Sequence, residues 1–352
     1  MNRPGTHRFC VAPMMDCTDR HDRHLLRLIS RHARLYTEML TANAVIHGDR
    51  DHLLAFASGE HPVALQLGGA DPLQMAEAAA IGAEYGYDEI NINVGCPSDR
   101  VRSGRFGACL MAEPALVAEI FAAMQAAVRI PVTVKCRIGI DEQDEWGDLR
   151  NFVDVVAGAG CETFVVHARK AWLQGLSPRE NRTVPPLRYE RARQLKALFP
   201  HLTVVVNGGI ETLEQALAFL DDDPDGPALD GVMLGRAPYA RPYLLAQVDR
   251  LFFGDHSPVR SPREVMEAYA DYARAELAHG ARLGALSRHI VGLLHGMPGA
   301  RIWRRYLSEH AHREGVGAEL FGEAWAAAQS TGATNDLSGG GPAEQAEFRR
   351  RA

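Results

Sequence analysis

Apolar residues along the chain gather into short runs, and each run is followed by polar or glycine residues. Eight such runs precede residue 240, and stretches with helical spacing separate them. Runs of this length, bounded by turn-forming residues, are typical of buried β-strands. The predicted strands are Arg8 to Met15, Leu35 to Leu40, Pro62 to Gly69, Glu89 to Pro97, Pro131 to Ile140, Thr163 to Lys170, Leu202 to Gly209 and Gly231 to Pro238.

The clearest predicted helix lies between the third and fourth of these strands. Asp71 can cap its first turn, Pro72 occupies the first helical position, and Gly86 follows the last turn. Strands that alternate with helices pair in parallel. Eight repeats within about 240 residues match an α/β fold, the (β/α)8 TIM barrel, whose active site lies at the carboxyl ends of the strands.

The pattern changes after Gly254, where helical spacing continues without further strands. The helices expected there include Pro262 to Leu277 and Trp303 to His310. Beyond residue 330 the chain is rich in Gly, Ser and Ala, a composition typical of disorder. We therefore expect a catalytic barrel domain at 1–254, an all-α helical domain at 255–330 and a disordered tail at 331–352.

Composition is that of a soluble intracellular enzyme, expected in the cytoplasm. The 352 residues are 46% hydrophobic and 23% charged, with no signal peptide and no apolar run long enough to span a membrane. Six cysteines show neither a CxxC pair nor zinc-ligand spacing, so free thiols and no metal site are expected. The net charge of -6 argues against a uniformly basic nucleic-acid binder, although a local basic patch can still attract a polyanion.

Chemically capable side chains fall at the predicted strand ends. The fourth strand stops at Cys96, a thiol held between a glycine and a proline. The other strands end in Pro13-Met14-Met15, Glu38, Gln66, Lys135 with Arg137, His167 with Arg169, Asn207-Gly208-Gly209 and Gly235-Arg236, and Asn93 precedes Cys96. In a barrel all of these residues surround one mouth.

Two of these strand ends predict a phosphate site. Asn207-Gly208-Gly209 and Gly235 follow the seventh and eighth strands, where backbone N–H groups can approach a phosphate, and Arg236 can add a charged contact. The sequence has no dinucleotide or Walker fingerprint. The alternative is that these glycines only turn the chain into the next helix.

Lys135 indicates which cofactor the phosphate belongs to. Only three lysines occur in the chain, and this one ends the fifth strand. A compact positive charge suits the pyrimidine edge of a flavin, which Gln66 and His167 could hydrogen-bond while Pro13-Met14-Met15 packs against the ring. The alternatives are an ion pair for Lys135 and a satisfied core histidine for His167.

The chain resembles the tRNA-dihydrouridine synthases across roughly residues 8 to 325. The resemblance rests on APMMD at 12–16, QLGG at 66–69, NINVGCPS at 91–98, TVKCRIG at 133–139, VVHAR at 165–169, VNGGI at 206–210 and MLGRAPY at 233–239. Segments 36–50, 167–182 and 296–308 are similar to the DusA branch, which modifies D-loop uridines 20 and 20a. The resemblance implies bound FMN, NADPH as electron donor and tRNA as substrate, with no obligatory protein partner or membrane indicated.

The resemblance also assigns Cys96 as the acid of the reaction. Reducing the C5=C6 bond of uracil needs a hydride at C6 and a proton at C5, and a thiol with a pKa near 8.5 can donate that proton. An inert buried thiol is the alternative, which fits Cys136 and Cys161 better because they lie in or next to apolar runs. Asn93 is expected near the base.

A uridine in folded RNA must be extruded to reach a barrel mouth, at a cost that phosphate contacts can offset. Candidate contacts are Arg100 after Cys96, Arg179 and Arg182 after the sixth strand, and Arg301 and Arg304 in the helical domain. An ordinary solvated arginine surface is the alternative. Two other functions remain open. A flavin dehydrogenase acting on a free pyrimidine would leave the arginines without a role, and a noncatalytic RNA-binding protein would leave Cys96 and Lys135 without one.

Overall fold

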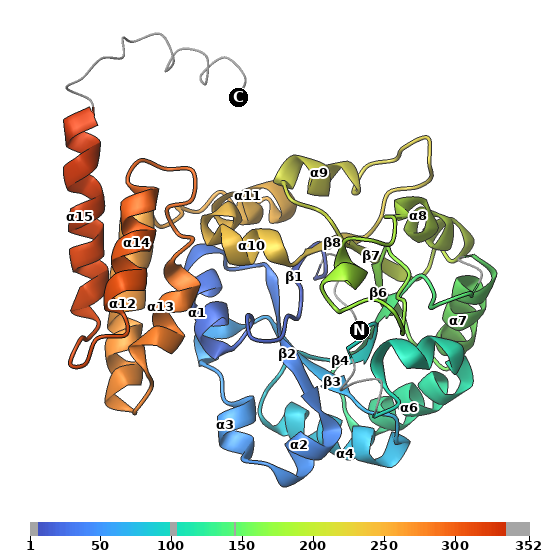
Figure 1. Cartoon of the computed structure of the whole chain (residues 1–352). Coiled ribbons are helices and arrows are strands. Elements are labelled where there is room, and N and C mark those ends of the chain that lie inside the picture. The colour runs from blue at the N-terminus through green and yellow to red at the C-terminus, as the bar shows by residue number, and fades with distance from the viewer. Residues whose placement is uncertain (1–5, 99–103, 144–145, 336–352) are drawn as a thin grey trace. The chain divides into compact units, whose positions relative to one another are not determined.

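The protein folds around a closed barrel of eight parallel strands, which pair in chain order from β1 to β8 and back to β1 (Figure 1). The computed structural model describes residues 6–98, 104–143 and 146–335. Its strands are β1 (Phe9–Val11), β2 (Arg34–Thr41), β3 (Val63–Gly68), β4 (Glu89–Val94), β5 (Val132–Arg137), β6 (Thr163–His167), β7 (Thr203–Asn207) and β8 (Gly231–Leu234). The predicted TIM barrel is therefore confirmed.

Every predicted strand is present, but most end earlier than their apolar runs. In β1 the amide of Ala12 makes the last ladder bond, 2.7 Å to Leu234 O, and Pro13 has no N–H with which to continue. In β4 the chain turns after Val94, since the amides of Gly95 and Cys96 bond to a side chain instead of a strand. The residues beyond each strand form the loops of the barrel mouth.

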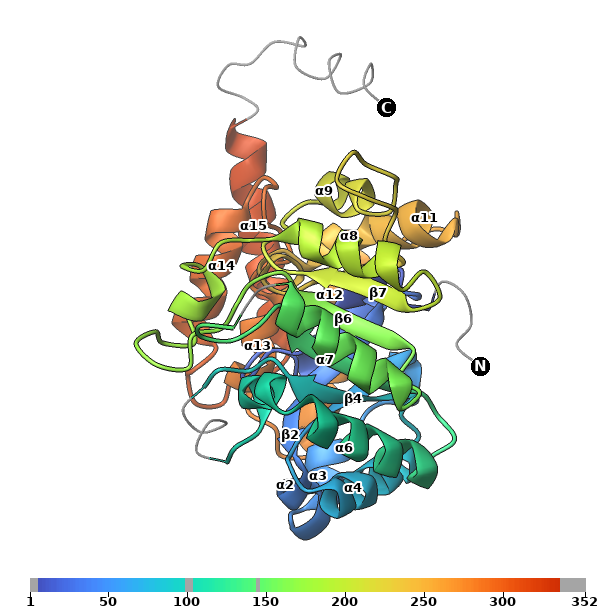
Figure 2. The same cartoon turned by 90° about the vertical axis from the view of Figure 1, so that its right-hand side faces the viewer.

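Helices surround the barrel, and α6, α7 and α8 lie outside strands β4, β6 and β7 (Figure 2). Asp71 caps α4 as predicted, accepting the Gln74 amide at 2.9 Å, and Gly86 follows the helix with φ +93°. The described α-helices up to residue 253 are α1 (Arg20–Ile29), α2 (Ala42–His47), α3 (Arg50–Leu54), α4 (Pro72–Glu84), α6 (Pro114–Ala127), α7 (Gly147–Gly158), α8 (Tyr189–Leu198), α9 (Leu213–Ala218), α10 (Arg236–Ala240) and α11 (Val248–Phe253). The 3-10 turns are η1 (Ser58–Glu60), η2 (Gly107–Ala112), η3 (Glu180–Arg182) and η4 (Pro242–Gln247).

A buried carboxylate lies inside the barrel at the amino ends of the strands. Glu89 accepts hydrogen bonds from Tyr36 Oη at 2.8 Å and Thr133 Oγ1 at 2.7 Å, and its other oxygen lies 2.6 Å from His7 Nε2 and 3.3 Å from Arg34 Nη1. Burial alone would raise the pKa of Glu89, but His7, Arg34 and the hydrogen bonds lower it to about 2. The carboxylate is therefore ionised at neutral pH.

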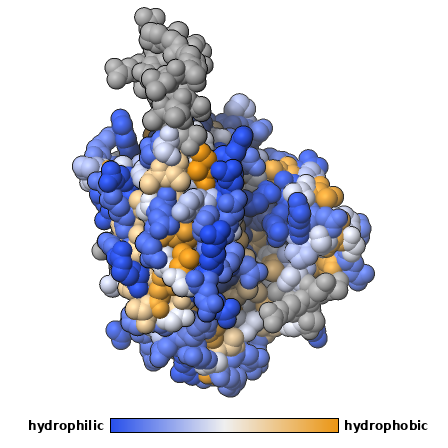
Figure 3. Space-filling view, turned by 60° about the vertical axis from the view of Figure 1, so that its left-hand side comes forward, coloured by the Kyte–Doolittle hydropathy of each residue, from blue (hydrophilic) through white to orange (hydrophobic). Residues whose placement is uncertain are grey.

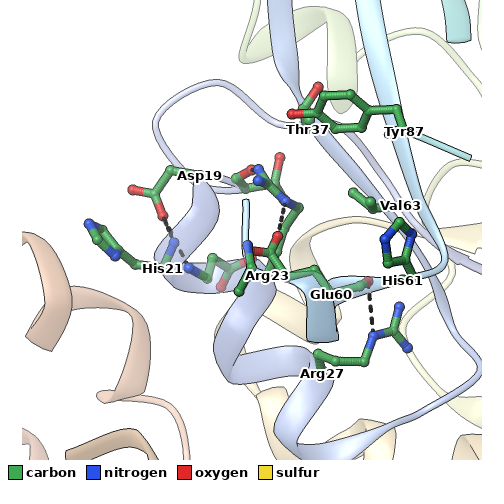
Figure 4. Close-up of polar contacts among 12 residues, drawn as sticks. Asp19, His21, Arg23, Arg27, Thr37, Glu60, His61, Val63 and Tyr87 are labelled. Atoms are coloured by element: carbon green, nitrogen blue, oxygen red, sulfur yellow. Dashed lines mark hydrogen bonds and ion pairs between the residues drawn. The ribbon is translucent and has the colours of Figure 1, made fainter. Parts of the chain in front are cut away.

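A second polar cluster anchors the loop between β1 and α1. Asp19 caps α1 by accepting the His21 amide, and Arg23 turns toward Glu60, 2.8 Å away (Figure 4). Arg23 also donates to Thr18 O at 3.0 Å, and the Thr18 hydroxyl accepts the Met14 amide at 3.0 Å. These contacts fix the position of the loop that carries Met14.

Backbone contacts divide the chain into two compact units. One comprises the chain to Tyr239 together with Leu244–Val259, and the other comprises Ala240–Tyr243 and the chain from Arg260 onward. The second unit contains α12 (Pro262–Ala278), α13 (Leu283–Ile290), α14 (Ala300–His310) and α15 (Glu319–Asn335). Trp303 is fully buried among them and donates to Ile290 O at 3.1 Å.

The beginning of the predicted tail is helical instead of disordered. Helix α15 continues to Asn335, because no proline interrupts its 17-residue run. The rest of the predicted tail, 336–352, lies outside the described residues. Hydrophilic residues cover most of the face seen in Figure 3. None of the described helices is long and apolar enough to cross a membrane.

Candidate active site

The parallel register brings polar side chains of neighbouring strands together at the carboxyl end of the barrel. Asn93 pairs with Lys135 across β4 and β5, and His167 pairs with Asn207 across β6 and β7. Arg137, which ends β5, pairs with His167. The structure thus gathers the predicted residues of four consecutive strands at one mouth.

The Lys135 ammonium occupies this mouth and donates to Asn207 Oδ1 at 3.1 Å. Burial, together with the nearby Arg137 charge, lowers the pKa of Lys135 to about 8. Its recorded partner among the described residues is an amide oxygen and not a carboxylate, so the ion-pair alternative is not supported. A mostly protonated ammonium with spare donors remains available to a ligand at neutral pH.

His167 faces the glycine turn that follows β7. Burial, reinforced by the charges of Arg137 and Lys135, holds the pKa of His167 well below its usual range, so the ring is neutral. A Cβ on Gly208 would lie 2.6 Å from His167 Cδ2, and Gly208 has φ +116°. Only glycine fits there, because both the space and the backbone conformation exclude a side chain.

The ends of β7 and β8 form a second part of the mouth. Gly209 also has a positive φ, +66°, and the side-chain Nδ2 of Asn207 donates to Met233 O at 2.7 Å. A Cβ on Gly235 would lie 3.1 Å from Met14 Sδ, so the β1 loop lies directly against the end of β8. The remaining predicted residues here are Pro13, which is half-buried, and Met15 and Arg236, which are exposed.

Cys96 lies in a loop whose backbone is held on several sides. Asn93 Oδ1 accepts the amides of Gly95 at 3.1 Å and Cys96 at 3.0 Å, and Cys96 O accepts the Ala108 amide at 3.0 Å. The thiol is half-buried, with its sulfur 3.5 Å from Ser98 Oγ. All six cysteines are thiols that form no disulfide, as predicted.

The other cysteines of the strands differ from Cys96 in their surroundings. Cys136 is fully buried, and burial raises its pKa to about 12, while burial also raises the pKa of Cys161. These two thiols match the inert alternative. Cys96 remains partly open to the mouth, where a substrate could reach it.

Two arginines at the strand ends have roles that the sequence alone did not assign. Arg137 donates to Gly95 O at 3.1 Å, Lys170 O at 3.1 Å and Asn181 O at 3.0 Å, so it ties the Cys96 loop to the loop after β6. Arg169 donates to Pro185 O, but its Nε is buried without a hydrogen-bond partner among the described residues. Both could have been suspected because each charged residue follows an apolar strand.

The donors around the mouth fit a phosphorylated flavin. Among the described residues the Arg169 Nε lacks a partner, and Lys135 has N–H donors beyond its bond to Asn207. Two consecutive glycines with positive φ turn the backbone after β7, where N–H groups can face an anion. Gln66, at 1% exposure, lies inside the barrel on β3. The mouth therefore combines groups that can bind a phosphate with neutral side chains that can hydrogen-bond a flavin ring.

The predicted tRNA contacts are distributed over both units. Arg179 and Arg182 are exposed in the loop after β6, and Arg301 and Arg304 are exposed on α14. Arg100 lies outside the described residues. Asn93 is buried, and its hydrogen bonds connect the barrel interior with the Cys96 loop.

Sequence comparison shows what the whole chain is similar to. A sequence model of the family described as Dihydrouridine synthase (Dus) matches residues 10–329. The tRNA-dihydrouridine(20/20a) synthase of Vibrio vulnificus is 55% identical over 320 residues, covering 91% of this chain and 96% of that protein. The synthase of the same name from Synechocystis sp. is 56% identical over 311 residues, covering 88% of this chain and 91% of that protein.

A solved structure agrees with the fold. A 2-naphthoyl-CoA reductase in complex with 2-naphthoyl-CoA superimposes with a TM-score of 0.53 at 12% sequence identity. The match covers 70% of this chain, which spans about half, 51%, of that longer protein. At this identity the similarity concerns the fold alone.

Proposed function

The chain belongs to the dihydrouridine synthase family, and from this premise we propose that it is an FMN-dependent tRNA-dihydrouridine synthase acting on D-loop uridines 20 and 20a. As a family member it is an oxidoreductase that reduces uridine in tRNA. The choice of positions 20 and 20a is supported by relatives of that name that align along about nine-tenths of the chain. NADPH is the proposed electron donor.

FMN is the proposed resident cofactor. The phosphate would be held by the backbone of Gly208 and Gly209, the Gly235 turn and Arg236, with Arg169 nearby. Lys135, His167 and Gln66 would hold the ring, against the wall formed by Pro13, Met14 and Met15. When bound and reduced, FMN supplies the hydride for C6 of uracil.

Cys96 is the proposed general acid. Its Sγ donates a proton to C5 of uracil, which with the hydride completes 5,6-dihydrouridine, and the thiolate is then reprotonated from solvent. The single observation that carries this assignment is the fixed Cys96 loop, whose amide bonds to Asn93 while Asn93 neighbours Lys135 in the strand register. Acid and cofactor-binding cation therefore lie at the same strand ends.

The exposed arginines are the proposed tRNA contacts. Arg179 and Arg182 would bind phosphates near the mouth, with Arg100 after Cys96, and Arg301 and Arg304 would bind phosphates from the helical unit. Such contacts orient the RNA and offset the cost of extruding the target base. Asn93 would lie next to that base.

The proposal is tested by incubating the purified protein, FMN and NADPH with an unmodified tRNA transcript and mapping dihydrouridine. Product at positions 20 and 20a, with none formed from free uridine or uracil, is the expected result. Reduction of the free pyrimidine at a comparable rate would favour the small-molecule dehydrogenase. Tight tRNA binding without any product would favour a noncatalytic RNA-binding protein.

A further inference from the structure

A continuous line of hydrogen bonds starts at Glu89, inside the barrel. The Thr133 hydroxyl donates to Glu89 Oε1 at 2.7 Å and accepts from Asn91 Nδ2 at 2.8 Å. Asn91 Oδ1 in turn accepts from Gln66 Nε2 at 2.8 Å. The register explains this alignment, since Gln66 pairs with Asn91 and Asn91 with Thr133 on strands β3, β4 and β5.

The line continues to the loop that carries Cys96. Gln66 Oε1 accepts from Asn93 Nδ2 at 2.7 Å, and Asn93 Oδ1 accepts the amides of Gly95 and Cys96. We call Glu89, Thr133, Asn91, Gln66 and Asn93 the barrel relay. It therefore connects a buried carboxylate at the amino ends of the strands with the backbone of Cys96 at their carboxyl ends.

The two ends of the barrel relay require the same orientation of every side chain between them. An ionised carboxylate only accepts hydrogen bonds, and a backbone N–H only donates. Each side-chain amide along the line therefore points its N–H toward Glu89 and its oxygen toward Cys96. His7 and Arg34 keep Glu89 in the accepting form through their contacts with its second oxygen.

Five polar side chains in this part of the barrel are more than packing requires, because bulky aliphatic residues usually fill barrel interiors. Buried polar networks are costly unless every member is satisfied, and when satisfied they favour one arrangement over others. Gln66, in the middle, uses its oxygen and one N–H within the relay. One N–H remains to donate to a ligand at the mouth.

We propose that Thr133 and Asn91 are positioning residues, which act through Gln66 and Asn93 to hold the Cys96 loop and the Gln66 N–H in the geometry of the reaction. This inference rests on the proposed function, in which Cys96 is the acid and Gln66 contacts FMN. The side-chain bonds of Thr133 and Asn91 run to Glu89, to each other and to Gln66, and none goes directly to the Cys96 loop. Their contribution to the rate is carried by side-chain orientation alone.

The test compares Thr133→Val, which removes the hydroxyl at nearly constant volume, with Thr133→Ser, which keeps it. Thr163→Val, in a buried threonine at the start of β6, is a matched control. The FMN-loaded enzymes are reduced without oxygen and mixed either with tRNA or with oxygen. Reoxidation by oxygen needs no proton from Cys96, so it reports only whether the flavin site is intact.

Thr133→Val should slow reoxidation by tRNA about tenfold, since small errors in the geometry of reacting groups cost one to two orders of magnitude. The rate of reoxidation by oxygen and the KM for tRNA should both stay within about twofold of their wild-type values. Thr133→Ser should restore the rate, and Thr163→Val should leave it unchanged. Equal rates with tRNA for Thr133→Val and wild type would overturn the proposal.

A second interruption covers the possibility that Thr133→Val does not fold. Asn91→Leu breaks the barrel relay in its middle and leaves the contacts of Glu89 with His7 and Tyr36 in place. It should reproduce the selective loss with tRNA. Loss of folding in both variants, or equal slowing with tRNA and oxygen, would make the barrel relay a stability element and contradict the positioning role.

The Cys96→Ala background separates this inference from the proposed function. If Cys96 is the acid and Thr133 positions it, adding Thr133→Val to Cys96→Ala should slow the reaction less than it slows the wild type. Suppose that Cys96→Ala has a large effect and that Thr133→Val slows Cys96→Ala as much as it slows the wild type. That result would overturn the positioning inference alone. No effect of Cys96→Ala would instead overturn the assignment of the acid.

Discussion

The Lys135 ammonium donates to Asn207 Oδ1 across 3.1 Å, which links the end of β5 to the end of β7. The side-chain Nδ2 of Asn207 itself donates to Met233 O on β8, so Oδ1 is directed toward the lysine. Strand ends on opposite sides of His167 are thereby joined. The arrangement presents a positive charge to the mouth without neutralising it.

Affinity for FMN should therefore depend on pH. Burial lowers the pKa of Lys135 to about 8 in the cofactor-free protein, so the ammonium that favours an electron-rich ligand is present below that pH and lost above it. The dissociation constant for FMN, measured by fluorescence quenching, should increase as pH rises through about 8. Lys135→Met should weaken binding and remove this dependence, whereas Lys196→Met, which breaks a distant pair with Asp230, should leave it unchanged.

Gly208→Ala should abolish FMN retention. The new Cβ would lie 2.6 Å from His167 Cδ2 in a backbone conformation that disfavours any side chain, at a cost of about 1–3 kcal/mol in stability. FMN content and melting temperature check this expectation. Gly158→Ala is the matched control, because no described atom outside its own helix lies within 4 Å of the added Cβ. Normal FMN content in both variants would contradict the proposed phosphate turn.

Arg236→Ala should weaken FMN binding by about 1–3 kcal/mol, the value of a hydrogen bond to a charged group. Arg236 is exposed in the cofactor-free protein, so the fold should tolerate its removal. Isothermal titration of the cofactor-free variants with FMN gives the difference. Arg150→Ala removes another exposed arginine, on α7, and an equal loss there would make the Arg236 effect nonspecific.

The pair Arg301→Ala and Arg304→Ala should raise the dissociation constant for tRNA. Both side chains are exposed on α14, and each lost phosphate contact should flatten the salt dependence by up to about one unit. Reduction of bound FMN by NADPH should not change. As a control, Arg263→Ala and Arg274→Ala remove exposed arginines of the same unit that already pair with Glu267 and Asp271. Unchanged tRNA affinity in the α14 double variant would make those arginines an ordinary solvated surface.

Much of the fold could be predicted because its signals are local. The run from Glu89 to Val94 is buried as a strand, and Asp71 with Pro72 starts a helix whatever the rest of the chain does. The predicted strand ends were less accurate than the strands themselves. The end of β1 depends on which residue accepts the last hydrogen bond of the strand ladder, and that residue is Leu234. That partner is more than 200 residues away in sequence.

The sequence predicted which side chains gather at the barrel mouth, but not the contacts that they make there. Strand-end position alone indicated Cys96, Lys135 and His167, because a parallel barrel brings all its carboxyl ends together. The partners of Asn91 and Thr133 depend on the register between strands, which no local pattern encodes. Arg137 was seen at its strand end, but its three backbone acceptors lie on two loops distant in sequence.

The most direct test of the central claim is the rate at which tRNA reoxidises the reduced flavin of Cys96→Ala. We expect a rate about 100- to 10,000-fold below wild type, the usual contribution of a general acid, with NADPH reduction and FMN content unchanged. Cys109→Ala, in the η2 turn near the Cys96 loop, should keep the wild-type rate. A wild-type rate in Cys96→Ala would contradict the account and require another proton donor at the barrel mouth.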